Sequence, residues 1–153
     1  MRRLIERYQL IPHPEGGHFR ETYRSAQKIH SPKAGEERDA LTHIYFLLQK
    51  GEISRFHRVS HDEIWHFYEG DPVRILLFDG RRLEEETIGP GRDSYFRAVP
   101  GGVFQAAETT GAYTLAGCVV APGFDFKDFS FLADRDQTSA LFRSRHPGLE
   151  RFL

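Results

Sequence analysis

The sequence has a single cysteine, Cys118, and no apolar run near the ~20 residues that a membrane-spanning helix requires. One cysteine excludes an intrachain disulfide, so a reducing, cytoplasmic setting is expected. Cys118 lies in the apolar segment 114–121, where an inert buried thiol is expected rather than a nucleophile. The first residues, MRRLIERYQL, include Glu6 and lack the apolar core of a signal peptide. We therefore expect a cytoplasmic protein with no membrane partner.

The chain also lacks a strong net charge of either sign. Its 21 Lys and Arg residues balance 22 Asp and Glu residues, so the formal net charge is −1. This balance gives no electrostatic reason to expect nucleic acid or an anionic membrane as a partner. The length of 153 residues and the 39% hydrophobic content favour one folded domain with one substantial core. We predict a single domain over residues 1–153.

Short alternating segments separated by Gly, Pro and Asp turns fill the middle of the chain. Strands are predicted at 18–24, 41–48, 53–59, 63–68, 73–78, 82–88, 95–99, 103–108 and 113–121. Regular short strands of this kind are typical of an all-β sandwich or barrel. Short helices are expected over 2–9 and, with a break at 146–148, over 137–152. The polar segment 25–39 is predicted to be a mobile surface loop or lid, and 124–132 an edge strand or a crossing segment.

The clearest functional pattern lies between Gly51 and Gly70, in the segment GEISRFHRVSHDEIWHFYEG. Side chains alternate between the two faces of a strand. Two sets can therefore face a common interior: Arg55, His57 and Val59 from the first strand, and Glu63, Trp65 and Phe67 from the second. If the turn at 60–62 brings these faces together, His57 and Glu63 converge among aromatic rings.

This spacing resembles the first motif of the cupin superfamily, G-x5-H-x-H-x3-E-x6-G. Gly51, His57, Glu63 and Gly70 stand at the required positions, and Val59 replaces the second histidine. The second cupin motif, P-x-G-x2-H-x3-N, is matched in part. Pro100 and Gly102 stand at its first two positions, while Gln105 replaces the histidine and Thr109 the asparagine.

Three further segments, 10–17, 65–68 and 121–126, are similar to one uncharacterised single-domain cupin family. The resemblance covers nearly the whole chain. It implies an all-β fold, the double-stranded β-helix or cupin jelly-roll barrel, with short N- and C-terminal helices. It also implies a homodimer, which would cover exposed strand edges.

The same resemblance implies a metal site with His57, Glu63 and Gln105 as ligands. One nitrogen, one carboxylate oxygen and one amide oxygen form a weaker set than the three histidines and one glutamate that many cupins use. A divalent transition metal is therefore one alternative for the cofactor. His61, in the turn, and His66, whose parity requires a bulge to face the interior, are further candidates.

A metal-free interpretation uses the same residues as an acid and a base. His57 beside a buried carboxylate is a candidate general base, and Tyr45 or Tyr95 a candidate acid. The dTDP-sugar 3,5-epimerases, which share the cupin fold, work in this way without a metal. Trp65, Phe67 and Tyr45 are suited to stacking on a sugar ring or a planar base. Three arginines are candidates for holding an anionic group: Arg20, Arg24 and Arg55.

We therefore expect a small-molecule-binding cupin, an enzyme of the isomerase or epimerase type or a metal-assisted one. Its substrate would be a carbohydrate-like or carboxylated metabolite. One alternative is a cupin that binds or senses a ligand without chemistry. Another is a structural role, in which His57 and Glu63 form a satisfied interior pair and aromatic side chains fill the barrel.

Overall fold

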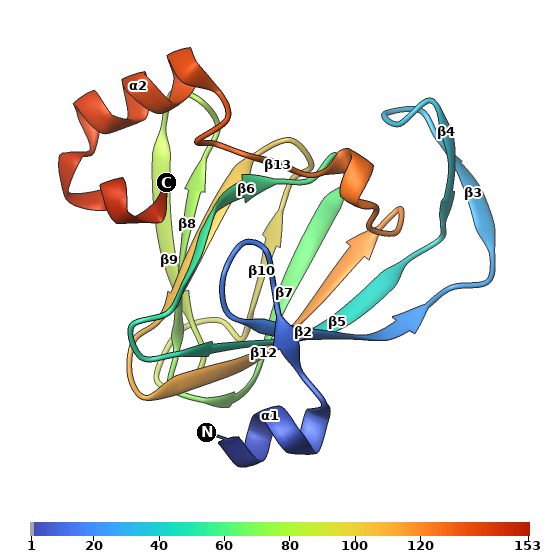
Figure 1. Cartoon of the computed structure of the whole chain (residues 1–153), viewed down its shortest axis with the longest axis horizontal. Coiled ribbons are helices and arrows are strands. Elements are labelled where there is room, and N and C mark those ends of the chain that lie inside the picture. The colour runs from blue at the N-terminus through green and yellow to red at the C-terminus, as the bar shows by residue number, and fades with distance from the viewer. Residues whose placement is uncertain (1) are drawn as a thin grey trace.

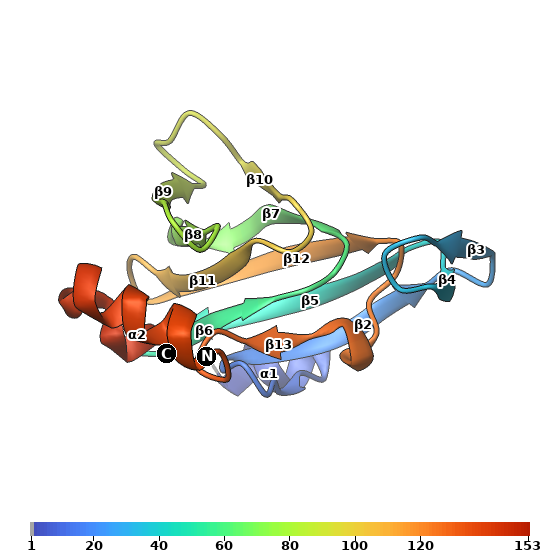
Figure 2. The ribbon, with the colours of Figure 1, turned by 90° about the horizontal axis from the view of Figure 1, so that it is seen from above.

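The computed structural model of the chain describes residues 2–153. Two antiparallel sheets face each other and form the body of the molecule (Figures 1 and 2). The first sheet has the strand order β1-β2-β5-β12-β7-β10, with bounds Ile11–Pro12, His18–Arg24, Thr42–Gln49, Tyr113–Ala121, Asp62–Gly70 and Phe96–Val99. The second has the order β13-β6-β11-β8-β9, with bounds Ser130–Phe131, Ile53–Arg58, Phe104–Thr109, Val73–Phe78 and Leu83–Ile88. This arrangement confirms the predicted all-β jelly roll.

The helical segments lie at the two ends of the chain and near its last strand. Their bounds are α1 Arg2–Tyr8, η1 Phe126–Asp128, α2 Asp136–Arg145 and η2 Pro147–Phe152. The predicted short terminal helices are thereby confirmed, including the break at His146, where α2 ends. Within residues 2–153, no helix is long and apolar enough to cross a membrane.

Strand β8 explains how the layers are held together. Its side chains alternate, so Ile75 and Leu77 join the core between the two sheets, while Leu76 and Phe78 face outward. The outward pair is covered by Phe142 of α2 and by η2, which makes both faces of this sheet buried. The packing supports one domain that includes the C-terminal helices, and the predicted extent of 1–153 stays a prediction.

The predicted mobile loop at 25–39 is wrong in its secondary structure. The segment forms a two-stranded hairpin, β3 Lys28–Ser31 and β4 Glu36–Asp39, which projects beyond the body of the molecule (Figure 1). Its charged residues are fastened to neighbours: Arg38 donates to Asp128 of η1 through Nε, at 2.8 Å. The segment 124–132 shows both predicted alternatives: it crosses from the first sheet to the second and ends in the two-residue edge strand β13, which pairs with β6.

Candidate functional site

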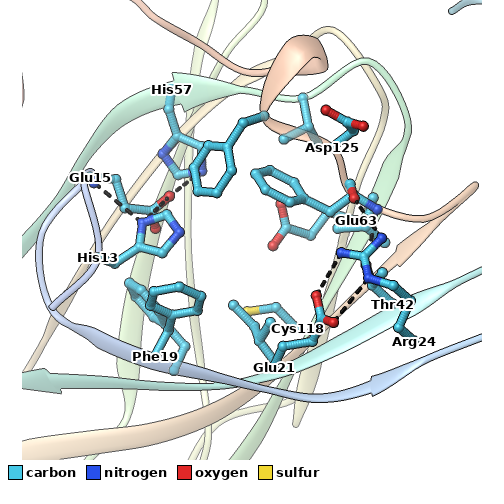
Figure 3. Close-up of a pocket in the computed structure, with 16 residues that line it drawn as sticks. His13, Glu15, Phe19, Glu21, Arg24, Thr42, His57, Glu63, Cys118 and Asp125 are labelled. Carbon is cyan, nitrogen blue, oxygen red and sulfur yellow. Dashed lines mark hydrogen bonds and ion pairs between the residues drawn. The ribbon is translucent and has the colours of Figure 1, made fainter. Parts of the chain in front are cut away.

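A cavity of about 330 Å³ opens between the two sheets, beside the hairpin. Its apolar walls come from aromatic and branched side chains on both sheets and on the crossing segment: Phe19, Ile44, Phe46, Val59, Val120, Phe124 and Phe126. Its interior carries four titratable side chains, His13, Glu15, His57 and Glu63. Figure 3 shows Glu63 and the group formed by His13, Glu15 and His57 projecting toward the cavity from different sides.

His57 is held by a partner at each ring nitrogen. Its Nδ1 lies 2.7 Å from the backbone oxygen of Arg55, so Nδ1 carries the proton and donates it. Its Nε2 lies 3.1 Å from Oε2 of Glu15. The ring stacks on Phe129, with centroids 5.2 Å apart and planes inclined by 17°. These contacts fix the tautomer and orientation of an imidazole that is 2% exposed.

Glu15 reaches this site because the turn between β1 and β2 docks against β6. Gly16 has a φ of +109°, and a Cβ placed on it would lie 2.1 Å from the backbone oxygen of Ile53. Only glycine permits both this backbone conformation and this close approach. The Glu15 backbone oxygen then accepts from Arg55 N–H at 2.9 Å, and its Oε1 accepts from the Ser54 hydroxyl at 2.8 Å. From the sequence, the segment 10–17 is notable only for its similarity to the cupin family, and neither Glu15 nor His13 is predicted as a site residue.

Glu63 is held by a different network, on β7. Oε2 of Glu63 accepts a hydrogen bond from Nε2 of Gln105, at 2.5 Å. Oε1 of Gln105 in turn accepts from Nε1–H of Trp65, at 2.8 Å. Because an indole N–H can only donate, Trp65 determines which end of the Gln105 amide faces the carboxyl group. The thiol of Cys118 also lies within hydrogen-bonding reach of Glu63.

Burial alters the protonation of all four titratable groups. It raises the pKa of Glu15 to about 8 and that of Glu63 to about 7. It lowers the pKa of His57, and together with the nearby His57 it lowers the pKa of His13 to about 4. At neutral pH the site therefore holds a protonated Glu15 beside a neutral His57, and a Glu63 that exists in both forms. Such separated pKa values are typical of groups that exchange protons with a ligand.

The mouth of the cavity carries one arginine, Arg24, whose charge is already compensated. Its Nε and Nη2 donate to the two carboxylate oxygens of Glu21, at 2.9 and 2.6 Å. Its Nη1 donates to Asp39 at 2.7 Å and to the backbone oxygen of Phe124 at 3.2 Å. The guanidinium group thus links the segments that form the mouth of the cavity, and it adds no net positive charge there.

A family model described as Cupin superfamily (DUF985) matches residues 2–132 of the chain. The chain belongs to this cupin family. A hypothetical protein from Leishmania major of known structure is 31% identical, with a TM-score of 0.81, over 95% of this chain and 92% of that one. A Shewanella oneidensis protein is 30% identical, with a TM-score of 0.83, over 98% of this chain and 94% of that one. An uncharacterised protein of Saccharomyces cerevisiae is 32% identical over 160 residues, which cover 92% of this chain and 79% of the relative.

Two of the residues expected at this cupin's site lie inside the barrel without lining its cavity. Trp65 is 1% exposed and packs edge-on against Phe46, with ring centroids 5.5 Å apart. Phe67 packs against the same core and contacts Tyr95, with centroids 5.9 Å apart. The predicted parity was right, since both face the interior with Glu63. Their rings fill the core, so the expectation that they stack on a ligand does not fit their position.

The candidate acid Tyr45 lies on the other face of its sheet. Ile44 and Phe46 line the cavity, so Tyr45, between them on β5, points outward. There it contacts Tyr8 of α1 and Tyr68, with centroids 5.0 and 5.9 Å away. Tyr45 therefore cannot reach a ligand in the cavity, and the prediction that placed it there is corrected. Tyr95 is 56% exposed and lies outside the cavity lining too.

Strand bulges explain where the three candidate arginines lie. A register shift in β2 between Glu21 and Tyr23 separates Arg24, which lines the cavity mouth, from Arg20, which donates to Gln9 at 2.5 Å outside the barrel. A second shift, in the pairing of β6, turns Arg55 over the ring of Phe131, 4.3 Å from its centroid. Arg20 and Arg55 therefore lie outside the cavity lining, contrary to expectation.

The two histidines whose orientation the sequence left open both lie away from the cavity lining. Nε2 of His61 lies 2.6 Å from the Ser31 hydroxyl oxygen, which fastens the β3–β4 hairpin to the turn before β7. His66 lies on the outer face of β7, where its charge would oppose that of His43. Neither lines the cavity with His57 and Glu63.

The described residues do not fit the predicted metal site. Gln105 presents its amide nitrogen to Glu63 because Trp65 occupies its oxygen, and an amide N–H group is not a metal ligand. Val59, at the position of the second motif histidine, has no donor atom. Among residues 2–153, no group of three or more His, Cys, Asp or Glu side chains is arranged to hold a metal ion. Of the four motif positions, only those of His57 and Glu63 keep a free donor atom, too few for a structural or catalytic transition metal. His13 and Glu15, which also line the cavity, contact each other, and Glu15 also contacts His57.

Proposed function

We propose that this cupin binds a small carbohydrate-like metabolite and catalyses a proton transfer of the isomerase or epimerase type without a metal ion. The observation that carries the proposal is the pair of separate protonatable units in one cavity. Glu63 with Gln105 forms the first unit, and Glu15 with His57 forms the second. Burying such ionisable groups costs free energy, whereas burying apolar side chains of similar size would not carry this cost.

The two units suit the two halves of an enolisation. Glu63 in its carboxylate form accepts a proton from a carbon next to a carbonyl group. The proton that Glu15 shares with Nε2 of His57, at 3.1 Å, moves from Glu15 to the carbonyl oxygen, so the hydrogen bond to His57 is exchanged for one to the ligand as the enol forms. Protonation of the opposite face of the same carbon by solvent, with release of the proton held on Glu63, completes an epimerisation. Transfer of the proton from Glu63 to the neighbouring carbon completes an isomerisation, and in both cases a hydroxyl proton returns to Glu15. A pKa of about 7 for Glu63 suits a base at neutral pH.

The charge of the cavity favours an uncharged ligand over a carboxylated one. Arg24, the arginine that lines the mouth, already donates hydrogen bonds to Glu21 and Asp39. The other titratable lining groups include Glu15, Glu63 and Asp125, which would repel an anion when they are ionised. Hydroxyl groups can bond to these acids, and a ring can lie against the aromatic walls.

The alternative of a cupin that binds or senses a ligand without chemistry uses the same cavity. It is favoured by the full set of partners around His57, both of whose nitrogens are occupied. The metal-assisted alternative would require Gln105 to turn away from Trp65 and so break the bond between them. A homodimer and a cytoplasmic location are the remaining finer expectations.

The experiment is a two-step assay on the purified chain, run in parallel in buffer with and without a chelator. Aldoses, ketoses and keto acids are first screened for binding by thermal shift, and ligands that bind are then incubated in D₂O and followed by proton NMR. The proposal expects deuterium to replace a hydrogen next to the carbonyl group, unaffected by the chelator. Saturable binding without exchange over the whole panel would instead support the non-catalytic alternative. Exchange that a chelator abolishes would support the metal-assisted one.

A further inference from the structure

A second cavity, of about 370 Å³, lies beside the first and is lined by positive charge. Four cationic side chains from separate segments line it: Lys33 of the hairpin turn, Arg58 of β6, Lys127 of η1 and Arg135 at the start of α2. Val59 belongs to the lining of both cavities, and Phe129, which stacks on His57, lines the second. Glu15, His57 and Glu63 do not line it, so within residues 2–153 it is a site distinct from the acid–base groups.

The positive charge of this second cavity is largely uncompensated. Asp128 is the acidic residue of its lining, and Arg38 already binds both of its oxygens, at 2.8 and 3.0 Å. Lys127 lies 3.7 Å from Glu36. Over residues 3–153, neither Arg58 nor Arg135 makes an ion pair with a carboxylate, nor does the lysine of the hairpin turn. Other arginines of the chain do pair with carboxylates: Arg24, Arg38, Arg74, Arg97 and Arg151.

Arg58 is positioned in advance to bind a ligand. Its Nε donates to the Ser130 hydroxyl at 3.2 Å, and its guanidinium carbon lies 4.9 Å from the ring centroid of Phe104. Its two Nη groups have no acceptor among the described residues. Burial lowers the pKa of Arg58, and the nearby charge of Arg135 lowers it further. The two cations therefore repel each other, and a bound anion would relieve this repulsion.

We propose that this second cavity binds a phosphate group, either free or as part of a phosphate ester. A tetrahedral dianion can accept hydrogen bonds from several directions at once, which matches cations that come from four separate segments. The planar fork of Arg58 suits two phosphate oxygens, while the lysines act as point charges. A bound phosphate would also link the β3–β4 hairpin and α2 to the barrel.

The test is isothermal titration calorimetry of the full chain with inorganic phosphate and with phenyl phosphate, at an ionic strength held constant with NaCl. The expected result is saturable binding of one anion per chain. Arg58→Gln and Arg135→Ala are each expected to weaken it roughly tenfold, the factor that corresponds to about 1.4 kcal/mol. Arg143→Ala is the matched control, because it removes the same charge from an exposed position of α2 outside the cavity. The ester binding more tightly than inorganic phosphate would identify an ester as the preferred source, and equal affinity would identify the free ion.

Absence of saturable heat with both anions would overturn the proposal, as would equal weakening in Arg143→Ala and the two cavity variants. The Arg135→Ala variant keeps the test decisive if Arg58→Gln fails to fold, since the Arg135 side chain makes no capping hydrogen bond to α2. The result is independent of the proposed proton transfer, because the titration needs no turnover and the variants leave Glu15, His57 and Glu63 intact.

Discussion

Oε2 of Glu15 lies 3.1 Å from Nε2 of His57, although Glu15 comes from the turn between β1 and β2 and His57 from β6. The pair joins the N-terminal part of the chain to the motif that defines the interior of the barrel. Since the pKa of Glu15 is raised to about 8 and that of His57 is lowered, the pair is neutral at pH 7 and shares one hydrogen bond between a carboxylic acid and an imidazole.

Folding stability is expected to fall as the pH rises from about 6.5 to about 8, because below about 6.5 the lowered pKa values of His13 and His57 act in the opposite direction. An unfolded Glu releases its proton near its ordinary pKa of 4.5, whereas Glu63 in the folded chain keeps it until about 7. Between these two pKa values, Glu63 binds more protons in the folded state than in the unfolded state, so a rise in pH removes its contribution to stability. Glu63 alone accounts for roughly 3 kcal/mol, and Glu15 acts in the same direction. Urea unfolding at a series of pH values measures this, and Glu63→Gln should reduce the fall; a wild-type stability that rises between about pH 6.5 and 8 contradicts the assignment.

Gln105 is expected to hold the interior of the barrel together through its two hydrogen bonds. Gln105→Leu removes the partners of Trp65 and Glu63 at once and leaves both polar groups buried without them. The expected loss is about 2–4 kcal/mol of unfolding free energy. Denaturant unfolding followed by the fluorescence of Trp65, the one tryptophan of the chain, reports it directly. Gln137→Leu, the same replacement at an exposed position of α2, should change stability by less than about 0.5 kcal/mol; equal effects at the two positions would refute the role of Gln105.

The protein purified without chelator is expected to contain far less than one transition metal per chain. The donors that remain from the cupin motifs, His57 and Glu63, are too few, because Val59 and Gln105 occupy the other motif positions. Elemental analysis of the untagged chain tests this, with His57→Ala alongside. Val59→His combined with Gln105→His should create a site that retains zinc or cobalt. Stoichiometric metal in the wild type that disappears in His57→Ala would show that the interpretation of the donor set is wrong.

A homodimer is expected to form through the outer face of the six-stranded sheet. Tyr68 and Phe96 are 46% and 55% exposed, and Phe96 pairs opposite His66, which places all three side chains on this face. Light scattering after size exclusion should give twice the mass of the chain, and Tyr68→Asp should shift the population toward the monomer. Glu37→Gln, on the hairpin, serves as the control. A wild-type monomer at high micromolar concentration would contradict the prediction.

The sequence predicted the fold and two of the four titratable residues that converge in the cavity. The other residues were misplaced or missed because of local features of individual strands and turns. Period-2 alternation correctly put His57 and Glu63 in one interior, because the strands that carry them are regular at those positions. It failed for Arg20 and Arg55, which lie outside the cavity lining because their strands contain register shifts that change parity without a sequence signal. It grouped Tyr45 with one face of β5 but gave no means to decide which face points inward.

Glu15 escaped sequence analysis for a different reason. A carboxyl group in a Pro and Gly-rich turn normally faces solvent. The only signal was the pair Gly16 and Gly17, whose positive φ values allow the turn to press against neighbouring strands. Burial of Glu15 follows from that contact, which involves residues of β6 that no local pattern connects to the turn.

Proton abstraction by Glu63 is measured as the rate of solvent hydrogen exchange into a bound carbohydrate ligand, in the wild type and in Glu63→Gln. The account predicts a loss of at least about 100-fold in the variant, the usual contribution of a general base. Glu15→Gln should lose activity too while it keeps ligand affinity, and Glu37→Gln, at an exposed hairpin position outside the cavity lining, should match the wild type. Exchange that continues at the wild-type rate in Glu63→Gln would contradict the account.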